Sequence, residues 1–430
     1  MLSSYRALLA RAGAGPLALV CAFGWVAFGG YSLALILLVH AGSGSFAQAG
    51  GAVAAFSVGS GVAAPARGRL IDRRGPRWLA GFALTHGAAA AALILCLDLH
   101  TGFIEVLITA GLFGVMAPPL FATVRLVWVA VAGELTPTAH ALNGALGDAG
   151  QLAGPALAGA MAAAVTPTFG FVALVACASG CAAYVSVRWG GVAPGPATEA
   201  EVTEAEAPAS DAAVAAVATV ASEPPRERRR RPLPLENPGL LTLLSGDAAF
   251  GVIYGAVAVA VTALCARTHG AAWAALPLSV ASVGSVLVSL WSGTGRIRLS
   301  VRARYLGGCW LAAVFLLVLP ASGSIVVVTL LLVCSGGGDG LLNVALYELL
   351  DEVVPTSRAV EAFTWLSTAQ GAGLALGSVL AGALAGTGAA AAFIPVCVAA
   401  VIAALTPTLR RKTLRDVVSS KDSGAVSSAS

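Results

Sequence analysis

Residues 68–77 read GRLIDRRGPR and lie between two long apolar runs, at roughly 46–66 and 78–98. Each run can cross the hydrocarbon core of a bilayer, because a spanning helix needs about 20 mostly apolar residues. The stretch between them holds one acid, four arginines and two glycines. Cytoplasmic loops of membrane proteins are enriched in Lys and Arg, so the stretch indicates a cytoplasmic turn between two spanning helices.

The composition of the whole chain supports a protein with many such helices. Of its 430 residues, 58% are hydrophobic and only 11% are charged, whereas an ordinary soluble domain is about one quarter charged. A soluble protein could not bury that much apolar surface, and the same apolar content excludes disorder over most of the chain. The net charge of +4 is too small to indicate a nucleic-acid-binding protein.

Twelve apolar runs of suitable length follow one another along the chain. They are rich in Ala, Leu, Val and Gly and lack the alternation of a barrel wall, so helices are predicted rather than strands. We therefore expect an all-α membrane protein with twelve transmembrane helices. The predicted helices lie at roughly 16–40, 46–66, 78–98, 102–130, 139–164, 168–188, 240–265, 272–292, 302–320, 324–347, 359–385 and 388–409.

Basic residues predict which helix ends face the cytoplasm. Lys and Arg gather after the second, sixth, eighth and twelfth runs, as at Arg77, Arg188, Arg304 and Arg411. The other side holds only Arg267, among acids and histidines. By the enrichment of basic residues in cytoplasmic loops, both termini are expected to be cytoplasmic.

A long gap divides the twelve runs into two groups of six. Residues 1–189 are predicted to form the first six-helix half and residues 239–412 the second. Residues 190–238 are rich in Ala, Pro and Glu and cannot bury enough apolar surface to offset ordering, so a disordered cytoplasmic linker is predicted there. Residues 413–430 are predicted to be a cytoplasmic tail.

The two halves share a short repeat where the fourth helix of each ends and the fifth begins. Residues 134–141 read ELTPTAHA, and residues 352–359 read EVVPTSRA. Halves related by an axis along the membrane normal place a substrate site between them. We therefore expect two six-helix pseudo-repeats with a site at their interface.

The stretch 68–77 resembles the signature that the major facilitator superfamily carries after the second of its twelve helices. A generic basic loop explains the arginines but not the spacing of the acid and the glycines. By this resemblance, the residues would latch one half against the other on the cytoplasmic side. The positions that fit are Gly68, Leu70, Asp72, Arg73, Gly75 and Arg77, and Pro76 replaces the usual basic residue.

Residues 150–159 read GQLAGPALAG and are similar to a helix-five motif of proton-coupled drug antiporters in that superfamily. Gly150, Gly154, Pro155 and Gly159 match, whereas Ala158 stands where the motif has Gly. Small residues four apart admit a partner backbone, and the proline bends the helix. The alternative is a helix-packing face without a role in antiport.

Three charged residues inside predicted helices are candidates for coupling transport to an ion. Arg125, Asp148 and Asp339 each cost about 2.5–3.5 kcal/mol at mid-helix on insertion scales. A titratable acid in a translocation path is a usual means of proton coupling, which favours Asp148 and Asp339. Arg125 and Asp148 lie at similar depths and can pair, so a structural ion pair is the alternative for these two.

Three aromatic residues are further candidates for the substrate site, and the sequence shows no metal-binding pattern. Trp25, Phe363 and Trp365 are candidates for the lining of a central cavity, although tryptophan is also a common anchor at the membrane interface. The five histidines show no HExxH spacing, and the eight cysteines form no CxxC pair. No metal site and no cofactor are therefore expected.

The resemblance implies a secondary carrier that works by alternating access, in which proton flow drives the export of a small molecule. The sequence contains no GxxxxGK[ST] loop, so coupling to ATP is unsupported, and we do not expect an enzyme. The expected partners are the substrate, protons and the lipid bilayer, with no nucleic acid, and the carrier is expected to be a monomer. The preference for Arg over Lys and for Ala and Gly indicates a high-GC bacterium, hence the plasma membrane.

Other functions remain open at this stage. An uptake carrier or facilitator for a sugar, an amino acid or an organic anion would use the same fold. A membrane-embedded enzyme would need clustered His, Asp or Ser at one interface, whereas the histidines here are dispersed. A sensor that has lost transport would use the linker 190–238 as its output.

Overall fold

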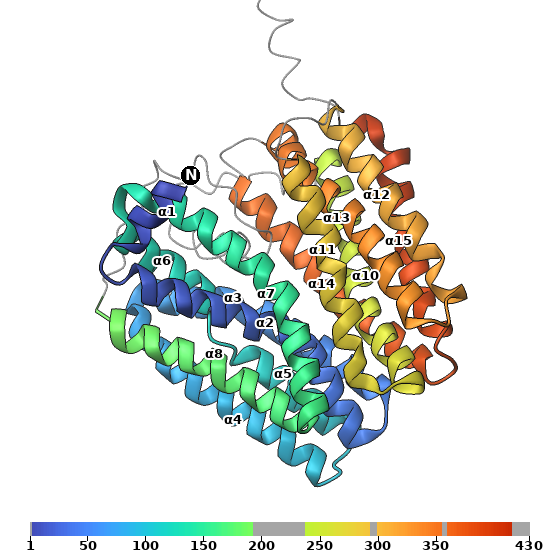
Figure 1. Cartoon of the computed structure of the whole chain (residues 1–430), viewed down its shortest axis with the longest axis horizontal. Helices are drawn as coiled ribbons and strands as arrows, with labels where there is room; N and C mark the ends of the chain where they lie inside the picture. The colour runs from blue at the N-terminus through green and yellow to red at the C-terminus, as the bar shows by residue number, and fades with distance from the viewer. Residues whose placement is uncertain (1, 192–236, 293–298, 355–358, 415–430) are drawn as a thin grey trace, which may run out of the picture.

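The computed structural model describes residues 2–191, 237–292, 299–354 and 359–414. These residues form two bundles of helices that lie side by side (Figure 1). The first bundle contains α1 (Leu2–Leu9), α2 (Ala14–Ser43), α3 (Phe46–Arg74), α4 (Leu79–Asp98), α5 (Phe103–Val115), α6 (Leu120–Ala132), α7 (Thr136–Ala164) and α8 (Pro167–Trp189). The second contains α10 (Pro238–Thr268), α11 (Ala275–Ser292), α12 (Val301–Leu317), α13 (Ile325–Val353), α14 (Ala359–Ala385) and α15 (Ile394–Leu409).

The prediction of an all-helical membrane protein is confirmed. Among the described residues, eleven segments are long and apolar enough to cross a membrane. The predicted helix 139–164 lies within the 29-residue α7, which is not one of the eleven. The number twelve, the pseudo-repeat and the cytoplasmic side of the termini therefore stay predictions. Almost all of the predicted linker, at 192–236, and residues 415–430 of the predicted tail lie outside the described residues.

Two predicted boundaries are corrected. The predicted helix 102–130 is two helices, because α5 ends at Val115 and α6 begins at Leu120. Pro118 and Pro119 between them lack the N–H groups that would continue the helix. The predicted helix 46–66 is also longer than expected, since α3 continues to Arg74.

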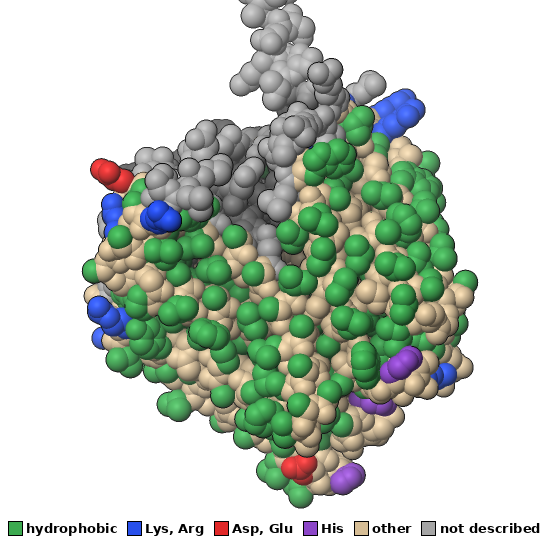
Figure 2. All heavy atoms as spheres, viewed as in Figure 1, with side chains coloured by type: hydrophobic (Ala, Val, Ile, Leu, Met, Phe, Trp, Pro, Cys, Tyr) green, Lys and Arg blue, Asp and Glu red, His purple; other side chains and the backbone are tan. Residues whose placement is uncertain are grey.

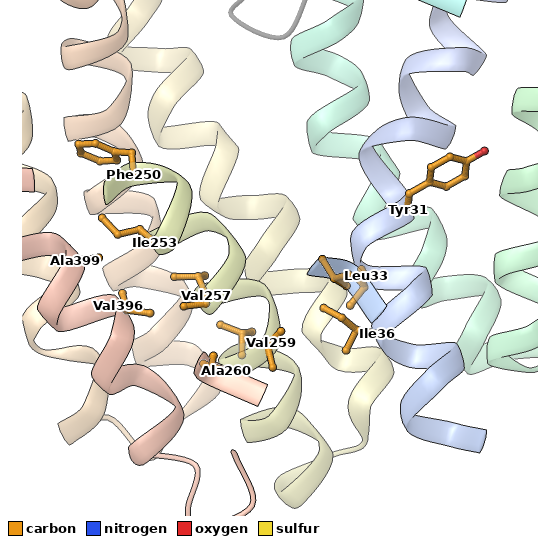
Figure 3. Close-up of a cluster of buried hydrophobic side chains, with 14 of the residues drawn as sticks. Tyr31, Leu33, Ile36, Phe250, Ile253, Val257, Val259, Ala260, Val396 and Ala399 are labelled. Atoms are coloured by element: carbon orange, nitrogen blue, oxygen red, sulfur yellow. The ribbon is translucent and has the colours of Figure 1, made fainter. Parts of the chain in front are cut away.

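A shared apolar core joins the bundles. Figure 3 shows Leu33 and Ile36 of α2 on one side of this core and Val257 and Val259 of α10 on the other. The buried residues of α10 occupy all of its faces, which is the pattern of a helix enclosed by others. Both bundles thus present their central helices to one continuous core.

Figure 2 shows basic side chains at the left and upper right of the molecule, with one acid beside those at the upper left, and histidines with another acid toward the lower end. Arg73 and Arg74 at the end of α3, Arg188 at the end of α8 and Arg302 at the start of α12 define what we call the arginine-rich end. At the opposite end, α3 begins and α14 ends.

Three close glycine contacts join the bundles near the end opposite the arginines. A Cβ added at Gly50 of α3 would lie 2.1 Å from the carbonyl oxygen of Ser378 in α14. One added at Gly382 of α14 would lie 2.5 Å from the carbonyl oxygen of Phe46, and one at Gly159 of α7 would lie 2.1 Å from the Cβ of Ala275. Glycine therefore lets the two bundles touch backbone to backbone at this end.

Replacing Gly50 by alanine is expected to lower the thermal midpoint in detergent. The added Cβ would meet the backbone of Ser378, and overpacking of this kind costs about 1–3 kcal/mol. The matched control is Gly61→Ala in the same helix, where no atom lies within 4 Å of the new Cβ. Alanine is a better helix former than glycine, so the control should hold or slightly raise the midpoint. Equal midpoints for the two variants would contradict the contact.

Candidate functional site

A hydrogen-bonded acid, Asp339, joins α10 and α13. The hydroxyl of Tyr254 donates to Asp339 Oδ1 at 2.5 Å. Asn343 lies one turn later on α13, on the same face as Asp339, and its Nδ2 reaches the same oxygen at 3.1 Å. One carboxylate oxygen thus accepts hydrogen bonds from side chains of two helices.

A second acid, Asp247, extends the group to α14. Asp247 lies two turns before Tyr254 on the same face of α10 and is 8% exposed. Gln370 Nε2 of α14 donates to Asp247 Oδ1 at 3.4 Å. We call these five residues the carboxylate cluster: Asp247, Tyr254, Asp339, Asn343 and Gln370.

Glycines place Gln370 beside Asp247. A Cβ added at Gly251 of α10 would lie 2.1 Å from the carbonyl oxygen of Gln370, and one at Gly373 of α14 would lie 2.1 Å from that of Ala248. Side chains larger than hydrogen at these positions would hold α10 and α14 apart. The close approach brings the amide of Gln370 within reach of the acid.

The environment of the two acids determines their chemistry. A charge inside an apolar bundle is costly unless it is hydrogen-bonded or paired. Within the described residues, both acids accept hydrogen bonds from neutral groups, and neither forms an ion pair with Lys or Arg. An acid held by neutral donors can gain and lose a proton without breaking an ion pair.

The first bundle contains a buried polar chain around His86 of α4. The hydroxyl of Tyr31 lies 3.0 Å from His86 Nε2, and His86 Nδ1 lies 3.1 Å from the carbonyl oxygen of Phe113. A carbonyl only accepts, so Nδ1 carries the proton, and in the neutral ring Nε2 accepts from Tyr31. The imidazole also stacks on the Phe113 ring, with centroids 4.2 Å apart.

The aromatic candidates lie in different surroundings. Trp25 is buried, stacks on Phe121 of α6 at 3.7 Å and points Nε1 at Asn143 Oδ1, 3.4 Å away. Phe28, three residues later, lies edge-on to the same pair and is 38% exposed. Trp365 of α14 is half-buried and packs against the core, whereas the side chain of Phe363 lies outside the described residues.

The stretch 68–77 is mostly helical. Gly68, Leu70 and Arg73 lie within the last turns of α3, and the chain turns at Gly75, whose φ is 77° and whose N–H donates to the Ile71 carbonyl at 2.7 Å. The predicted tight turn thus falls on this glycine. The carbonyl of Arg77 accepts from Ser186 Oγ of α8 at 2.7 Å. The side chain of Asp72 lies outside the described residues, so the predicted latch stays a prediction.

The helix-five motif contacts two partners. A Cβ added at Gly150 would lie 2.5 Å from the Cβ of Trp25, and one at Gly154 would lie 2.4 Å from the nitrogen of Gly30, both in α2. Gly159, beyond the buried Pro155, instead contacts α11 of the second bundle. The motif therefore packs α7 within its own bundle and against the other.

Two coupling candidates can be placed only by their backbone. Arg125 belongs to α6 and Asp148 to α7, and the side chains of both lie outside the described residues. Their predicted pairing stays a prediction. Asp339 is the one coupling candidate whose side chain the structure describes, and it lies at the centre of the carboxylate cluster.

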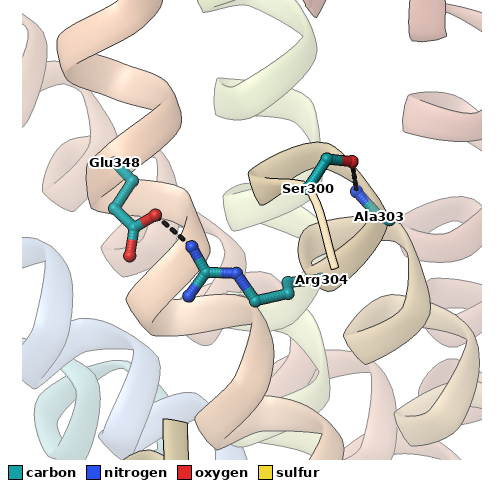
Figure 4. A network of polar contacts seen from close by, with 4 residues as sticks. All are labelled: Ser300, Ala303, Arg304 and Glu348. Carbon is teal, nitrogen blue, oxygen red and sulfur yellow. Dashed lines mark hydrogen bonds and ion pairs between the residues drawn. The ribbon is translucent and has the colours of Figure 1, made fainter. Parts of the chain in front are cut away.

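The arginine-rich end of the second bundle has an ion pair of its own. Arg304 of α12 pairs with Glu348 of α13, and Ser300 Oγ accepts from the Ala303 N–H at 3.3 Å to cap α12 (Figure 4). The loop 293–298 lacks the acid of the first-half stretch and lies outside the described residues. Glu348 supplies an acid to this end from 44 residues further along the chain.

Sequence reasoning missed most partners of the acids. Asn343 falls four residues after Asp339 and Tyr254 seven after Asp247, spacings that place each pair on one helix face. Those spacings were an available signal. Nothing in the sequence shows that Gln370 of another helix reaches Asp247.

Several solved structures share this fold at low sequence identity. A mutant of the nucleoside transporter NupG is 13% identical, with a TM-score of 0.69 over 93% of this chain and 99% of that one. An auto-inhibited POT family peptide transporter is 14% identical, with a TM-score of 0.64 over 93% and 96%. A bacterial homolog of the human lysosomal transporter Spinster, inward-facing and occupied, is 14% identical, with a TM-score of 0.57 over 93% and 94%. No curated protein sequence matches the chain.

The family model of the Major Facilitator Superfamily matches residues 17–378. The match begins in α2 and ends within α14, so it spans both bundles. This agrees with the fold and with the resemblance seen at residues 68–77. The chain belongs to the major facilitator superfamily of membrane transporters.

Proposed function

We propose that the protein is a proton-coupled secondary carrier that exports a small molecule by alternating access. The observation that carries the proposal is the carboxylate cluster, in which Asp339 and Asp247 lie among apolar helices and are held by neutral donors. Asp247 is buried and Asp339 is partly buried, and among the described residues neither has a cationic partner. An acid in this position is suited to carry a proton across a membrane. The carrier would act in a bacterial plasma membrane as a monomer.

Protonation of Asp339 would change how α10 and α13 hold each other. As a carboxylate, Asp339 only accepts hydrogen bonds, and Tyr254 and Asn343 both donate to Oδ1. As a carboxylic acid it carries a donor of its own: a proton on Oδ1 would displace one of these bonds, and a proton on Oδ2 would weaken both, because the neutral acid is the poorer acceptor. The bond from Tyr254 joins α10 to α13, so protonation would change how these two helices pack against each other.

The path from the acids to the bundle interface runs through α14. Gln370 of this helix contacts Asp247, and Ser378, about two turns later, meets Gly50 of the first bundle. A change at the acids would therefore reach the contact that holds the bundles together at the end opposite the arginines. Opening that end while the arginine-rich end closes is the alternating-access step.

The similar structures support transport but differ in substrate. Their names give nucleosides for NupG and peptides for the POT family transporter. Export rests on the likeness of residues 150–159 to the antiporter motif. The second candidate, which these neighbours favour, is an uptake carrier or facilitator. Two acids in the cluster favour a cationic or neutral substrate over an organic anion.

A flux assay in proteoliposomes tests proton coupling. We expect a pH gradient to drive movement of at least one member of a panel of lipophilic cations, sugars and amino acids. The variant Asp247→Asn, Asp339→Asn should lose gradient-driven flux at least tenfold, because neither amide can carry a proton. Exposed Asp98, where α4 ends, provides the control Asp98→Asn. Undiminished gradient-driven flux in the double variant would overturn the proposal that these acids couple transport to protons. The direction of the flux relative to the proton gradient distinguishes export from uptake.

A double-mutant cycle tests the bond between Tyr254 and Asp339. Tyr254→Phe removes the donor, and a hydrogen bond to a charged group contributes about 1.5–3 kcal/mol. In the Asp339→Asn background the same change should cost less, with an interaction energy of about 0.5–3 kcal/mol. Unfolding in detergent is the measurement. Tyr184→Phe on exposed α8 surface is the matched control, and additive effects at 254 and 339 would contradict the bond.

A further inference from the structure

The break between α5 and α6 removes the i+4 donors of two backbone carbonyls, and a tighter turn supplies the Gly114 carbonyl with the Ala117 N–H at 3.2 Å. In a continuous helix, the N–H of residue 118 would bond to the carbonyl of Gly114, and that of residue 119 to the carbonyl of Val115. Pro118 and Pro119 have no N–H to donate. The break lies within a segment, Phe103–Leu135, that is long and apolar enough to span the membrane. A carbonyl that lacks a donor is costly there.

A single side chain from α3 satisfies both carbonyls. Arg67 Nη1 donates to the carbonyl oxygen of Gly114 at 3.0 Å and to that of Val115 at 3.3 Å. The same nitrogen lies 2.5 Å from the carbonyl oxygen of Ala117. Arg67 Nη2 donates to the carbonyl oxygen of Ser60 at 2.7 Å and to its Oγ at 3.2 Å, which fixes the guanidinium against its own helix.

The chemistry of arginine suits this position. A guanidinium is a flat fork of five N–H donors, whereas a lysine ammonium is a point charge without that shape. Arg67 is 7% exposed and lies beyond the candidate span Phe46–Ala64. The guanidinium of arginine stays charged at neutral pH. Its hydrogen bonds therefore persist through the pH range of a working carrier.

Other side chains hold the pieces on either side of the break. His86 Nδ1 donates a hydrogen bond to the carbonyl of Phe113, the residue before Gly114. Arg11 Nη1 donates at 2.5 Å to the carbonyl of Ala132, the last residue of α6. The helix held in this way carries Phe121, which stacks on Trp25. The position of α6 thus determines where the Phe121 ring lies relative to Trp25.

We propose that Arg67 is a positioning residue that replaces the two backbone donors missing at Pro118 and Pro119. It keeps the break intact and makes it a hinge on which α6 turns relative to α5 during transport. Transport by members of this superfamily is the only property on which the inference depends. It does not require that the coupling ion is a proton.

Four proteins test the replacement of the donors: wild type, Arg67→Gln, Pro118→Ala with Pro119→Ala, and all three changes together. Arg67→Gln should lower the thermal midpoint in detergent on the order of 5 °C, because two buried carbonyls lose a donor. In the double-alanine background, the alanines supply the missing N–H groups, so the same change should cost less than half as much. The exposed Arg6 of α1 provides the matched control Arg6→Gln.

If Arg67→Gln lowered the thermal midpoint equally in both backgrounds, or in neither, the proposal that Arg67 replaces the missing donors would be overturned. If Arg67→Gln alone cannot be recovered folded, recovery of the triple variant is the expected suppression. Failure of the triple variant, when the double-alanine protein folds, would contradict the proposal.

Amide hydrogen exchange on the full chain tests the hinge without any substrate. We expect the amides of residues 120–123 to exchange at least tenfold faster in wild type than in the double-alanine variant, because the prolines interrupt the helical ladder at that point. Exchange in peptides from α4 should be the same in both proteins. The same exchange at residues 120–123 in both proteins would show a rigid break and overturn the hinge. Loss of proton-driven flux has no bearing on either readout, so failure of the proposed function would be recognised separately.

Discussion

Inside a bilayer, every backbone donor and acceptor must find its partner within the protein, and the rest of this structure depends on that constraint. Helices meet it locally along most of the chain. Where Pro118 and Pro119 interrupt the ladder, local backbone bonds such as Ala117 N–H to Gly114 are joined by donors from distant helices, Arg67 and His86. Two buried polar side chains, Arg67 and His86, thus support the chain at the break, as the proposed hinge requires.

The acids of the second bundle obey the same constraint. Asp339 and Asp247 are tolerated because Tyr254, Asn343 and Gln370 donate to them. The bond from Gln370 to Asp247 forms because α10 and α14 approach closely at their glycines. The opposite stretch of α14 contacts α3, so one helix connects the chemistry of the acids to the interface of the two bundles. Glycine contacts thus determine both where Gln370 meets Asp247 and where the bundles meet.

Local features of the fold could be predicted from the sequence, and long-range ones could not. Apolar runs reveal helices because hydropathy is local, and Asp339 stands out because charge is rare within such runs. The limits of a span are not the limits of its helix, which is why α3 continues to Arg74 through basic residues. The break at Pro118 and Pro119 was visible in the sequence, but the length of the apolar run masked it. Its partner Arg67 lies 47 residues away from Gly114, and no local pattern joins them.

Distance measurements between the bundles test the proposed proton-linked rocking most directly. Val187 near the end of α8 and Leu409 at the end of α15 are both exposed, at 86% and 78%, and both lie at the arginine-rich end. Spin labels on cysteines at these positions, with the eight native cysteines replaced, report how far apart the bundles are at that end. We predict two distances whose populations change between pH 8 and pH 5.5, and no change when Asp339→Asn and Asp247→Asn are added. A single distance that ignores pH, or a pH response that survives both substitutions, would contradict the account.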